Sequence, residues 1–319
     1  MQLDEVARAA ESIRTEIAKV IVGQDAVLDQ TVVALLAGGH VLLEGPPGTA
    51  KTLLVRALAQ VIQSQFRRIQ FTPDLMPADI VGVNIYRSDV GQFEFRPGPL
   101  FTDLLLADEI NRAPAKTQSA LLEAMQDLQA TVDGHVHRLS HVFTVFATQN
   151  PIEYEGTYPL PEAQLDRFMF KTLVGYPEKE QEVEILERYQ RGFDAARQET
   201  FGIESRSTID QIALTRDAVR QVQVMPVVLH YISSIVRGTR EYHALTLGAS
   251  PRASVMLLLA SKALAVLRGR SFVTPDDVRD MAFPTLRHRI ILSPEAEIEG
   301  VTADHCVKQV VDRVEVPRI

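Results

Sequence analysis

The chain has 319 residues, of which 46% are hydrophobic and 23% charged, and its formal net charge is −8. This composition is typical of globular proteins and is long enough for two domains. The negative charge disfavours duplex nucleic acid as the main partner, because proteins that bind phosphate backbones usually present a basic surface. Cys306 is the only cysteine. No disulfide can therefore form within the chain, as expected for a protein of the reducing cytoplasm.

The beginning of the chain, MQLDEVARAA, is acidic and has no apolar stretch, so we expect no signal peptide there. The longest apolar run, residues 253–267, contains Ser261 and Lys262 and is too short to cross a bilayer. We therefore expect a cytoplasmic protein without a membrane span.

Helical and strand-like patterns alternate through the first half of the chain. Apolar residues recur at helical spacing over residues 3–19 and 24–37. Strand-like runs and two further helical patterns follow, the strands at 40–44, 66–71, 103–108, 142–147 and 168–173 and the helices at 51–63 and 114–127. Buried strands that alternate with helices predict an α/β fold with a parallel sheet flanked by helices.

Two segments interrupt this alternation and are expected to project as small ribbons. Residues 81–97 read as two short strands around a turn, and residues 129–139 read as a hairpin around an Asp-Gly turn. Toward the C-terminus helical patterns dominate, at 178–191, 208–222, 228–243, 252–267 and 275–287. We therefore predict an α/β domain at residues 1–176 and an all-α domain at residues 177–319.

The segment VLLEGPPGTAKT, residues 41–52, carries the strongest functional signal. An apolar strand stops at a Gly/Pro-rich turn and a helical pattern follows, so backbone N–H groups and the helix N-terminus can surround phosphate oxygens. Lys51 supplies a positive charge for the β- and γ-phosphates, and the Thr52 hydroxyl can ligate Mg²⁺. Ala50 stands where a second glycine is expected, but it still allows a close backbone approach. A simple turn with a surface lysine is the alternative, which the strand and helix on either side disfavour.

Two carboxylates follow the apolar strand predicted at 103–108. Asp108 and Glu109 come at the carboxyl end of that strand, the edge where ligands bind in parallel sheets. Asp108 can hold Mg²⁺, directly or through water, and Glu109 can orient and deprotonate an attacking water. An acidic pair on a solvated loop is the alternative, which the phosphate loop at a plausible spacing disfavours.

Three further residues are candidates for contacts with a γ-phosphate. Asn150 follows another strand and can hydrogen-bond the attacking water, although Asn before Pro is also a common turn. Arg167, in LPEAQLDRF, and Arg252, in GASPRA, can each place a guanidinium on the phosphate. For both arginines an intrachain salt bridge is the alternative, such as one between Arg167 and Asp166 or Glu162.

Other polar residues have simpler interpretations. His135 and His137 share one face of a strand, but a metal site needs more ligands than these two. The Arg-His-Arg cluster at residues 287–289 is expected at a solvated helix end, with a face toward a neighbouring subunit as the alternative. Residues 178–187 are expected on a solvated helix face. Cys306 has apolar neighbours and is expected to be a buried structural thiol.

Together these segments resemble the MoxR family of AAA+ ATPases, which belongs to the clade with an insert in the second helix. The resemblance extends from VIVGQDAV, residues 20–27, to VTPDDVRDM, residues 273–281. It rests on GPPGTAKT, LLLADEINRAP, ATQNP, YPLPEAQLDRF and GASPRA. The two predicted ribbons look like the helix-2 insert and the pre-sensor hairpin of that clade, and MoxR-like loops commonly carry Ala at the position of Ala50.

The resemblance implies a role for each matching residue. Asn150 would be the first sensor, and Arg252 the second sensor on a helical lid that closes over the nucleotide. Arg167 would be an arginine finger acting on the ATP of the neighbouring subunit, with Arg112 as a further interface candidate. Catalytic roles are implied for Lys51, Glu109, Asn150, Arg167 and Arg252. Nucleotide contacts are implied for Val22, Gly23, Gly45, Pro46, Pro47, Gly48, Thr49, Ala50, Lys51 and Thr52, and Mg²⁺ contacts for Thr52 and Asp108.

The resemblance also implies ATP and Mg²⁺ as ligands and a homo-oligomer, with a hexameric ring as the expected form. The implied function is chaperone-like remodelling or maturation of protein complexes, often with a partner that bears a von Willebrand factor A domain. A motor subunit like that of metal chelatases is an alternative. A nucleic-acid translocase is disfavoured because the hairpin tip, residues 133–135, has no lysine, and a binding switch without turnover is disfavoured because Glu109 is present.

Overall fold

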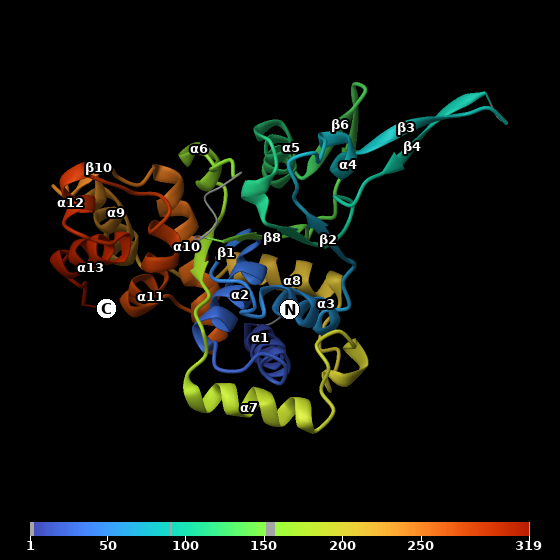
Figure 1. Cartoon of the computed structure of the whole chain (residues 1–319). Coiled ribbons are helices and arrows are strands. Elements are labelled where there is room, and N and C mark those ends of the chain that lie inside the picture. The colour runs from blue at the N-terminus through green and yellow to red at the C-terminus, as the bar shows by residue number, and fades with distance from the viewer. Residues whose placement is uncertain (1–2, 90, 151–156, 319) are drawn as a thin grey trace.

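The computed structural model describes residues 3–89, 91–150 and 157–318. Its centre is a five-stranded sheet in which all neighbouring strands are parallel (Figure 1). The strand order is β2 (Phe66–Gln70), β5 (Leu104–Asp108), β8 (Thr144–Gln149), β1 (Val41–Glu44) and β9 (Phe170–Leu173). The parallel α/β sheet predicted from the sequence is thus confirmed.

Alternating strand residues separate two apolar cores, one on each face of the sheet. Leu104 and Leu106 belong to one core, and Leu105 and Ala107 to the other. The first core also receives side chains from α1 (Leu3–Ala18), α2 (Asp25–Ala37) and α3 (Lys51–Val61), and the second from α5 (Ala115–Asp127). Because successive strand side chains point to opposite faces, apolar strands of this kind need helices on both sides.

Both predicted ribbons are present, and they contact each other. The first ribbon follows α4 (Pro77–Val81) and pairs β3 (Gly82–Arg87) with β4 (Gln92–Pro97). The second ribbon pairs β6 (Gln129–Val132) with β7 (His135–Arg138). Asn84 Nδ2 donates to Asp133 Oδ2 at 2.7 Å, and the His137 ring stacks on Phe95 with centroids 3.8 Å apart. The first ribbon extends away from the body of the molecule, at the upper right in Figure 1.

Helices make up most of the described chain after β9. In chain order they are α7 (Lys179–Gln190), α8 (Ile209–Arg220), α9 (Pro226–Arg240), α10 (Pro251–Leu267), α11 (Pro275–Leu286), α12 (Pro294–Ile298) and α13 (Ala303–Arg313). The remaining elements are short. Before β9 they are η1 (Ile110–Arg112) and α6 (Glu162–Leu165), and after it η2 (Gln198–Thr200), β10 (Leu245–Leu247) and β11 (Ile291–Leu292). Helix α8 packs on α2, where the buried Arg216 donates from Nε to Leu35 O at 2.9 Å. The division of the chain at residue 176 stays a prediction.

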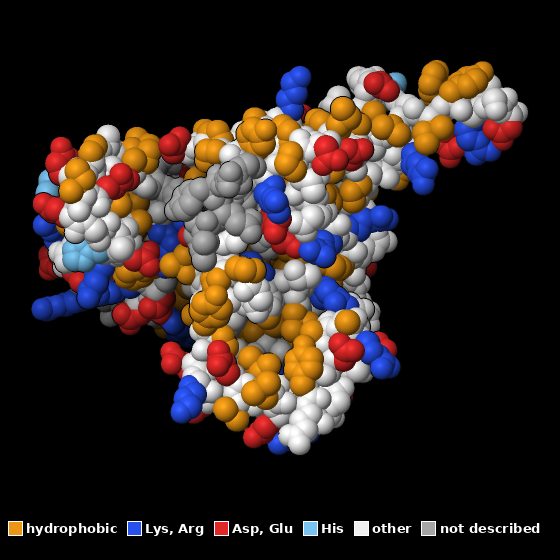
Figure 2. Space-filling view, viewed as in Figure 1, with side chains coloured by type: hydrophobic (Ala, Val, Ile, Leu, Met, Phe, Trp, Pro, Cys, Tyr) orange, Lys and Arg blue, Asp and Glu red, His pale blue; other side chains and the backbone are white. Residues whose placement is uncertain are grey.

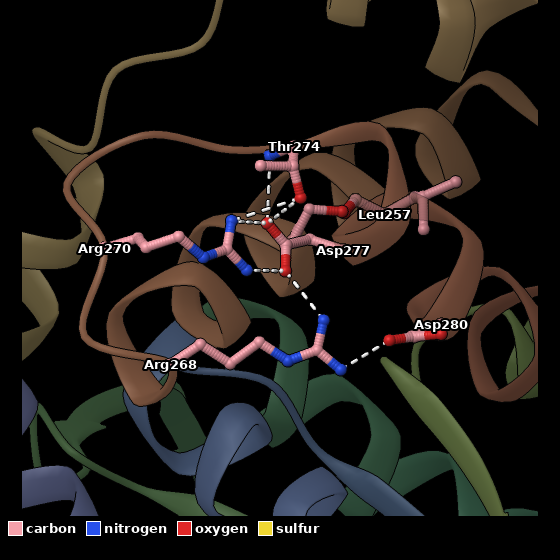
Figure 3. A network of polar contacts seen from close by, with 7 residues as sticks. Leu257, Arg268, Arg270, Thr274, Asp277 and Asp280 are labelled. Carbon is pink, nitrogen blue, oxygen red and sulfur yellow. Dashed lines mark hydrogen bonds and ion pairs between the residues drawn. The ribbon is translucent and has the colours of Figure 1, made fainter. Parts of the chain in front are cut away.

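A buried carboxylate joins α10 to α11 in this helical part (Figure 3). Asp277 is fully buried and accepts hydrogen bonds of 2.5 to 2.9 Å from the guanidinium groups of Arg268 and Arg270. The Thr274 N–H and hydroxyl each donate to the same carboxylate at 2.9 Å. A carboxylate tolerates such burial because its oxygens are paired with charged and neutral donors.

The Arg-His-Arg cluster at residues 287–289 is largely buried, so the expectation of a solvated helix end is wrong. The Arg289 side chain is 1% exposed, and His288 Nε2 lies 3.0 Å from Phe168 O. Burial lowers the pKa of His288 well below its usual value, and the charge of Arg289 lowers it further. A run of three polar residues at a helix end suggests exposure to solvent, but α11 ends against β9 and the segment before it. Phe168 O and Met169 O, just before β9, contact His288 and Arg289, and Lys171 O of β9 accepts from Arg287.

Cys306 on α13 is buried, as expected, and burial raises the pKa of its thiol. None of the described helices is both long and apolar enough to cross a membrane. Within the same residues, no group of three or more His, Cys, Asp or Glu side chains is arranged to hold a metal ion.

Candidate functional site

A cavity of about 510 Å³ opens at the carboxyl ends of β1, β5 and β8. Residues 47–52 of the predicted phosphate loop line it, together with Asp108, Glu109 and Asn150 from the ends of neighbouring strands. Its volume lies within the range of small-molecule sites. The sheet thus brings the loop, both carboxylates and Asn150 together, although they are far apart in the sequence.

The loop between β1 and α3 depends on unusual backbone conformations. Gly48 has a φ of 82° and Ala50 a φ of 62°, both in the left-handed region. A left-handed conformation costs a residue with a Cβ about 1–2 kcal/mol, which explains why glycine is expected at the position of Ala50. Gly45 has no room for a side chain, because a Cβ there would lie 2.1 Å from Val174 O. The loop therefore holds its shape against local strain, as functional loops often do.

Lys51 begins α3 and reaches back across the loop. Its Nζ donates to Gly45 O and to Pro46 O, both at 2.7 Å. Burial lowers the pKa of this ammonium group, and the charges of Asp108 and Glu109 act in the opposite direction. The first N–H groups of a helix have no partner within the helix. A cation beside those groups fits the phosphates of a nucleotide.

Asp108 is held by two neighbours. Its Oδ1 accepts from the Thr148 hydroxyl at 2.5 Å, and its Oδ2 accepts from Arg68 Nε and Nη2 at 3.0 and 2.7 Å. Arg68 comes from β2, and its side chain is half exposed. Thr52 lines the cavity together with Asp108. The Thr52 hydroxyl and a carboxylate fit the preference of Mg²⁺ for oxygen ligands. A cation bound to Asp108 would compete with Arg68 for one oxygen of this carboxylate.

The Glu109 carboxylate is also held by two donors. Its Oε2 accepts from Gln70 Nε2 at 2.7 Å and from Arg112 Nη1 at 2.9 Å. Glu109 has a left-handed backbone with a φ of 56°, and its N–H donates to Thr148 Oγ1 at 2.9 Å. Thr148 therefore stabilises both Asp108 and the strained residue that follows it. The contact with Gln70 ties the candidate base to β2.

Apolar side chains also line the cavity, alongside Arg56 and Arg188. Val20, Ile21 and Val22 line it from the segment between α1 and α2. Helix α7 adds Ile185 and Tyr189. None of the residues of α7 is buried, as expected for the solvated face at residues 178–187, although Ile185 also lines the cavity. An apolar pocket beside a phosphate loop fits a flat nucleobase.

Three of the expected nucleotide contacts lie next to the cavity without lining it. Among the described residues, the lining includes Val22 but not Gly23, Gly45 or Pro46. Gly23 lies against α7, because a Cβ there would be 2.1 Å from Gln181 Cδ. Gly45 and Pro46 act through their carbonyl groups, which hold Lys51.

Neither Arg167 nor Arg252 is among the described residues that line the cavity. Arg167 follows α6, and its Nε donates to Gln126 Oε1 on α5 at 3.2 Å. Arg252 is exposed on the first turn of α10. Ser250 Oγ donates to Asp166 Oδ2 at 3.1 Å, so the two arginines flank one junction between α6 and α10. The structure therefore does not bring either arginine to the cavity of its own chain.

Sequence reasoning missed several residues of the site. Arg68, Gln70 and Thr148 carry no local signal, because β2 and β8 become neighbours of β5 only through the order of the sheet. Ile185 and Tyr189 are four residues apart, a spacing that places both on one helix face and signals contact with an apolar surface.

Comparison with known proteins shows the family of the chain. Residues 40–170 match the model of the ATPase family associated with various cellular activities (AAA), and residues 237–310 match an AAA lid domain. The chain is 48% identical to YeaC of Bacillus subtilis, over 94% of this chain and 92% of that protein. It is 44% identical to Chaperone MoxR1 of Mycobacterium tuberculosis, over 95% of this chain and 81% of that protein. The chain belongs to the MoxR family of AAA+ ATPases.

A solved structure has the same fold as this MoxR-family chain. A protein from Cytophaga hutchinsonii, provisionally described as an ATPase, matches with a TM-score of 0.90 and 39% identity, over 98% of this chain and 96% of that one. Protein MoxR of Methylorubrum extorquens is 29% identical over 91% of this chain. The family predicted from the loop, strand and arginine segments is thus confirmed.

Proposed function

We propose that this MoxR-family chain hydrolyses ATP that is bound by one subunit and triggered by arginines of the next. One observation carries the proposal: the cavity gathers Lys51, Asp108 and Glu109, whereas Arg167 and Arg252 lie outside it. A guanidinium that stabilises a transferring phosphoryl group has to reach that group. Arginines on another surface of the chain reach it when a second copy docks over the cavity.

The residues of one subunit take distinct roles in this proposal. Lys51 exchanges its two carbonyl acceptors for phosphate oxygens, and the N–H groups of the loop donate to the same oxygens. Thr52 and Asp108 would hold Mg²⁺, which when bound neutralises charge on the phosphates. Glu109 accepts the proton of the attacking water, and Asn150 orients that water.

The proposed contact joins two different surfaces of identical subunits, so it is heterologous. Heterologous contacts generate a ring when the rotation between subunits closes. A hexamer is the size that the family resemblance implies. An isolated subunit should hydrolyse ATP slowly, because an arginine finger contributes about 10³–10⁵ to kcat in GTPases.

The ribbons are proposed to carry the motion to a protein client. Glu109 is followed directly by η1 and α5 and then by the ribbon β6–β7, which contacts the ribbon β3–β4. Apolar side chains are exposed on these ribbons, with Phe93 at 72%, Tyr86 at 57% and Val136 at 56%. Figure 2 shows hydrophobic side chains on the surface of the projecting ribbon at the upper right. Exposed apolar clusters are typical of surfaces that bind other proteins. This favours chaperone-like remodelling as the function of the ring.

Mixing subunits with complementary defects tests the proposal. Lys51→Ala should abolish ATP binding, whereas Glu109→Gln and Arg167→Ala should bind ATP and release phosphate very slowly. A mixed ring pairs the cavity of an Arg167→Ala subunit with the arginine of a Glu109→Gln neighbour. Phosphate release should therefore exceed that of either variant alone. Arg237→Ala, a change at an exposed arginine of α9, should keep full activity as the control. Failure of the mixture to regain activity at every ratio would contradict action in trans.

A further inference from the structure

The residue before Arg167 is held by two distant parts of the chain. Asp166 Oδ1 accepts from Arg289 Nε at 2.7 Å, and Asp166 Oδ2 accepts from Ser250 Oγ at 3.1 Å. Arg289 follows α11, and Ser250 precedes α10. Both oxygens of one carboxylate thus connect the segment after α6 to the helical part of the chain.

Arg289 is more deeply buried than the arginine of a surface ion pair, and it has more hydrogen-bond acceptors. Its side chain is 1% exposed, whereas that of Asp166 is 22% exposed. Besides the carboxylate, its guanidinium donates to Asp166 O at 3.0 Å, Phe168 O at 2.6 Å and Met169 O at 3.1 Å, and to Thr285 O. Three of these four carbonyls flank Arg167. A buried guanidinium with this many acceptors fixes the backbone on both sides of Arg167.

Ser250 is used in an unusual way. It stands at the N-cap position of α10, where a serine hydroxyl normally accepts a backbone N–H of the first helical turn. Here the Ser250 side chain makes no cap hydrogen bond and donates to Asp166 instead. Arg252 follows two residues later on the same helical turn. Burial lowers the pKa of Arg289, Asp166 opposes that shift, and the charge of Arg252 lowers the pKa further.

We propose that Asp166, Arg289 and Ser250 are positioning residues that hold Arg167 and Arg252 in one fixed arrangement for delivery to the neighbouring subunit. We call these three residues the arginine clamp. The inference rests on the proposed function, since it assigns the clamp to arginines that act in trans. Neither Arg289 nor Asp166 touches the cavity of its own chain among the described lining residues.

An arginine supplied to another subunit acts only in the correct orientation. Within the described residues the Arg167 side chain hydrogen-bonds to Gln126, a contact that leaves the position of its own backbone to other residues. Placement errors of about 1 Å at a reacting centre can reduce a rate by about 10²-fold. A clamp that restrains the backbone at residues 166–169, together with the start of α10, limits such errors for both arginines at once.

Asp166→Asn is the direct test, in the full chain and under ring-forming conditions. Removal of the negative charge leaves Arg289 without its ionic partner, and kcat should fall by about 10²-fold. ATP affinity, measured with a fluorescent nucleotide, should change less than twofold, because the cavity of the variant subunit is intact. Mixing Asp166→Asn with Glu109→Gln should restore phosphate release, whereas mixing it with Arg167→Ala should not, since both of these lack a competent finger.

Ser250→Ala is a milder second variant in case Asp166→Asn does not fold. The hydroxyl does not cap α10, so the helix should persist, and kcat should fall about threefold to tenfold, the effect of one hydrogen bond. The same mixture with Glu109→Gln should relieve this loss. Asp304→Asn is the matched control, because it also neutralises a partly exposed carboxylate paired with a largely buried arginine, Arg287, but does so away from residues 166–169.

The outcomes separate this inference from the proposed function. Near-normal turnover of both clamp variants would overturn the inference, and so would a loss that Glu109→Gln subunits do not rescue or a loss equal to that of Asp304→Asn. If Arg167→Ala itself is not rescued by Glu109→Gln subunits, action in trans is refuted and the inference falls with it.

Discussion

Replacing Gln70 by Ala should raise the basal ATPase rate. In the structure Gln70 Nε2 donates to Glu109 Oε2 at 2.7 Å and so binds the candidate base to β2. Glu109 has to leave this partner before its carboxylate can accept a proton from water at the γ-phosphate. The contact therefore stabilises a resting orientation at the expense of the active one.

The size of the effect follows from the type and exposure of the contact. Hydrogen bonds to charged groups contribute about 1.5–3 kcal/mol when buried. The Glu109 side chain is 30% exposed and Gln70 is exposed, so solvent reduces this contribution to about 1 kcal/mol. That difference corresponds to about a fivefold change in the population of the released carboxylate. With the resting orientation dominant, kcat should rise by about fivefold at saturating ATP.

The assay is steady-state phosphate release by the assembled protein over a range of ATP concentrations. Gln70→Ala should raise kcat and leave the affinity for ATP nearly unchanged. The matched control is the same substitution in a Glu109→Gln background, where no base remains to be released and the rate should not respond. Arg112→Ala should also raise the rate if its contact with Glu109 only restrains the base, and should lower it if Arg112 serves a neighbouring subunit.

A fall in kcat for Gln70→Ala would refute this reasoning, because it would show that Gln70 supports the active orientation of Glu109. An equal rise in the Glu109→Gln background would also refute it, since the effect could then not act through the carboxylate.

Two further predictions concern Asp108 and Asp277. Arg68→Ala should lower the Mg²⁺ concentration that gives half-maximal activity by about twofold to fivefold, because the ion pair with Asp108 is partly exposed. Arg67→Ala, on the opposite face of β2, should leave it unchanged, and equal effects of both would contradict the proposed competition. Asp277→Ala should lower the free energy of unfolding by about 3–5 kcal/mol in a denaturant titration, because Arg270 would lose its buried partner. Burial alone would raise the pKa of Asp277, but hydrogen bonds from Arg270 and Thr274 lower it. Its contribution is therefore present above about pH 4 and lost as pH falls through the folded pKa. An acid sensitivity unchanged in Asp277→Ala would contradict this.

The sequence alone determined the α/β architecture. It also determined the chemistry of the phosphate loop and of the two carboxylates. Apolar strands alternating with amphipathic helices predicted the parallel sheet, because strand and helix periodicities are local properties of the chain. The loop at residues 45–52 and the carboxylates at the end of a strand were also identifiable, since each is a short segment whose residue types and spacing follow from phosphate binding. These signals place Lys51, Asp108 and Glu109 at one edge of the sheet without knowledge of the fold.

Tertiary structure alone decided what surrounds these residues. Arg68 and Gln70 contact the carboxylates across about 40 residues of sequence, because β2 pairs with β5. Arg289 meets Asp166 across 123 residues, and its burial reverses the expectation of a solvated helix end. The placement of Arg252 outside the cavity likewise depends on how α10 packs. Such contacts are set by the order of strands and the packing of helices, and a local pattern carries no information about either.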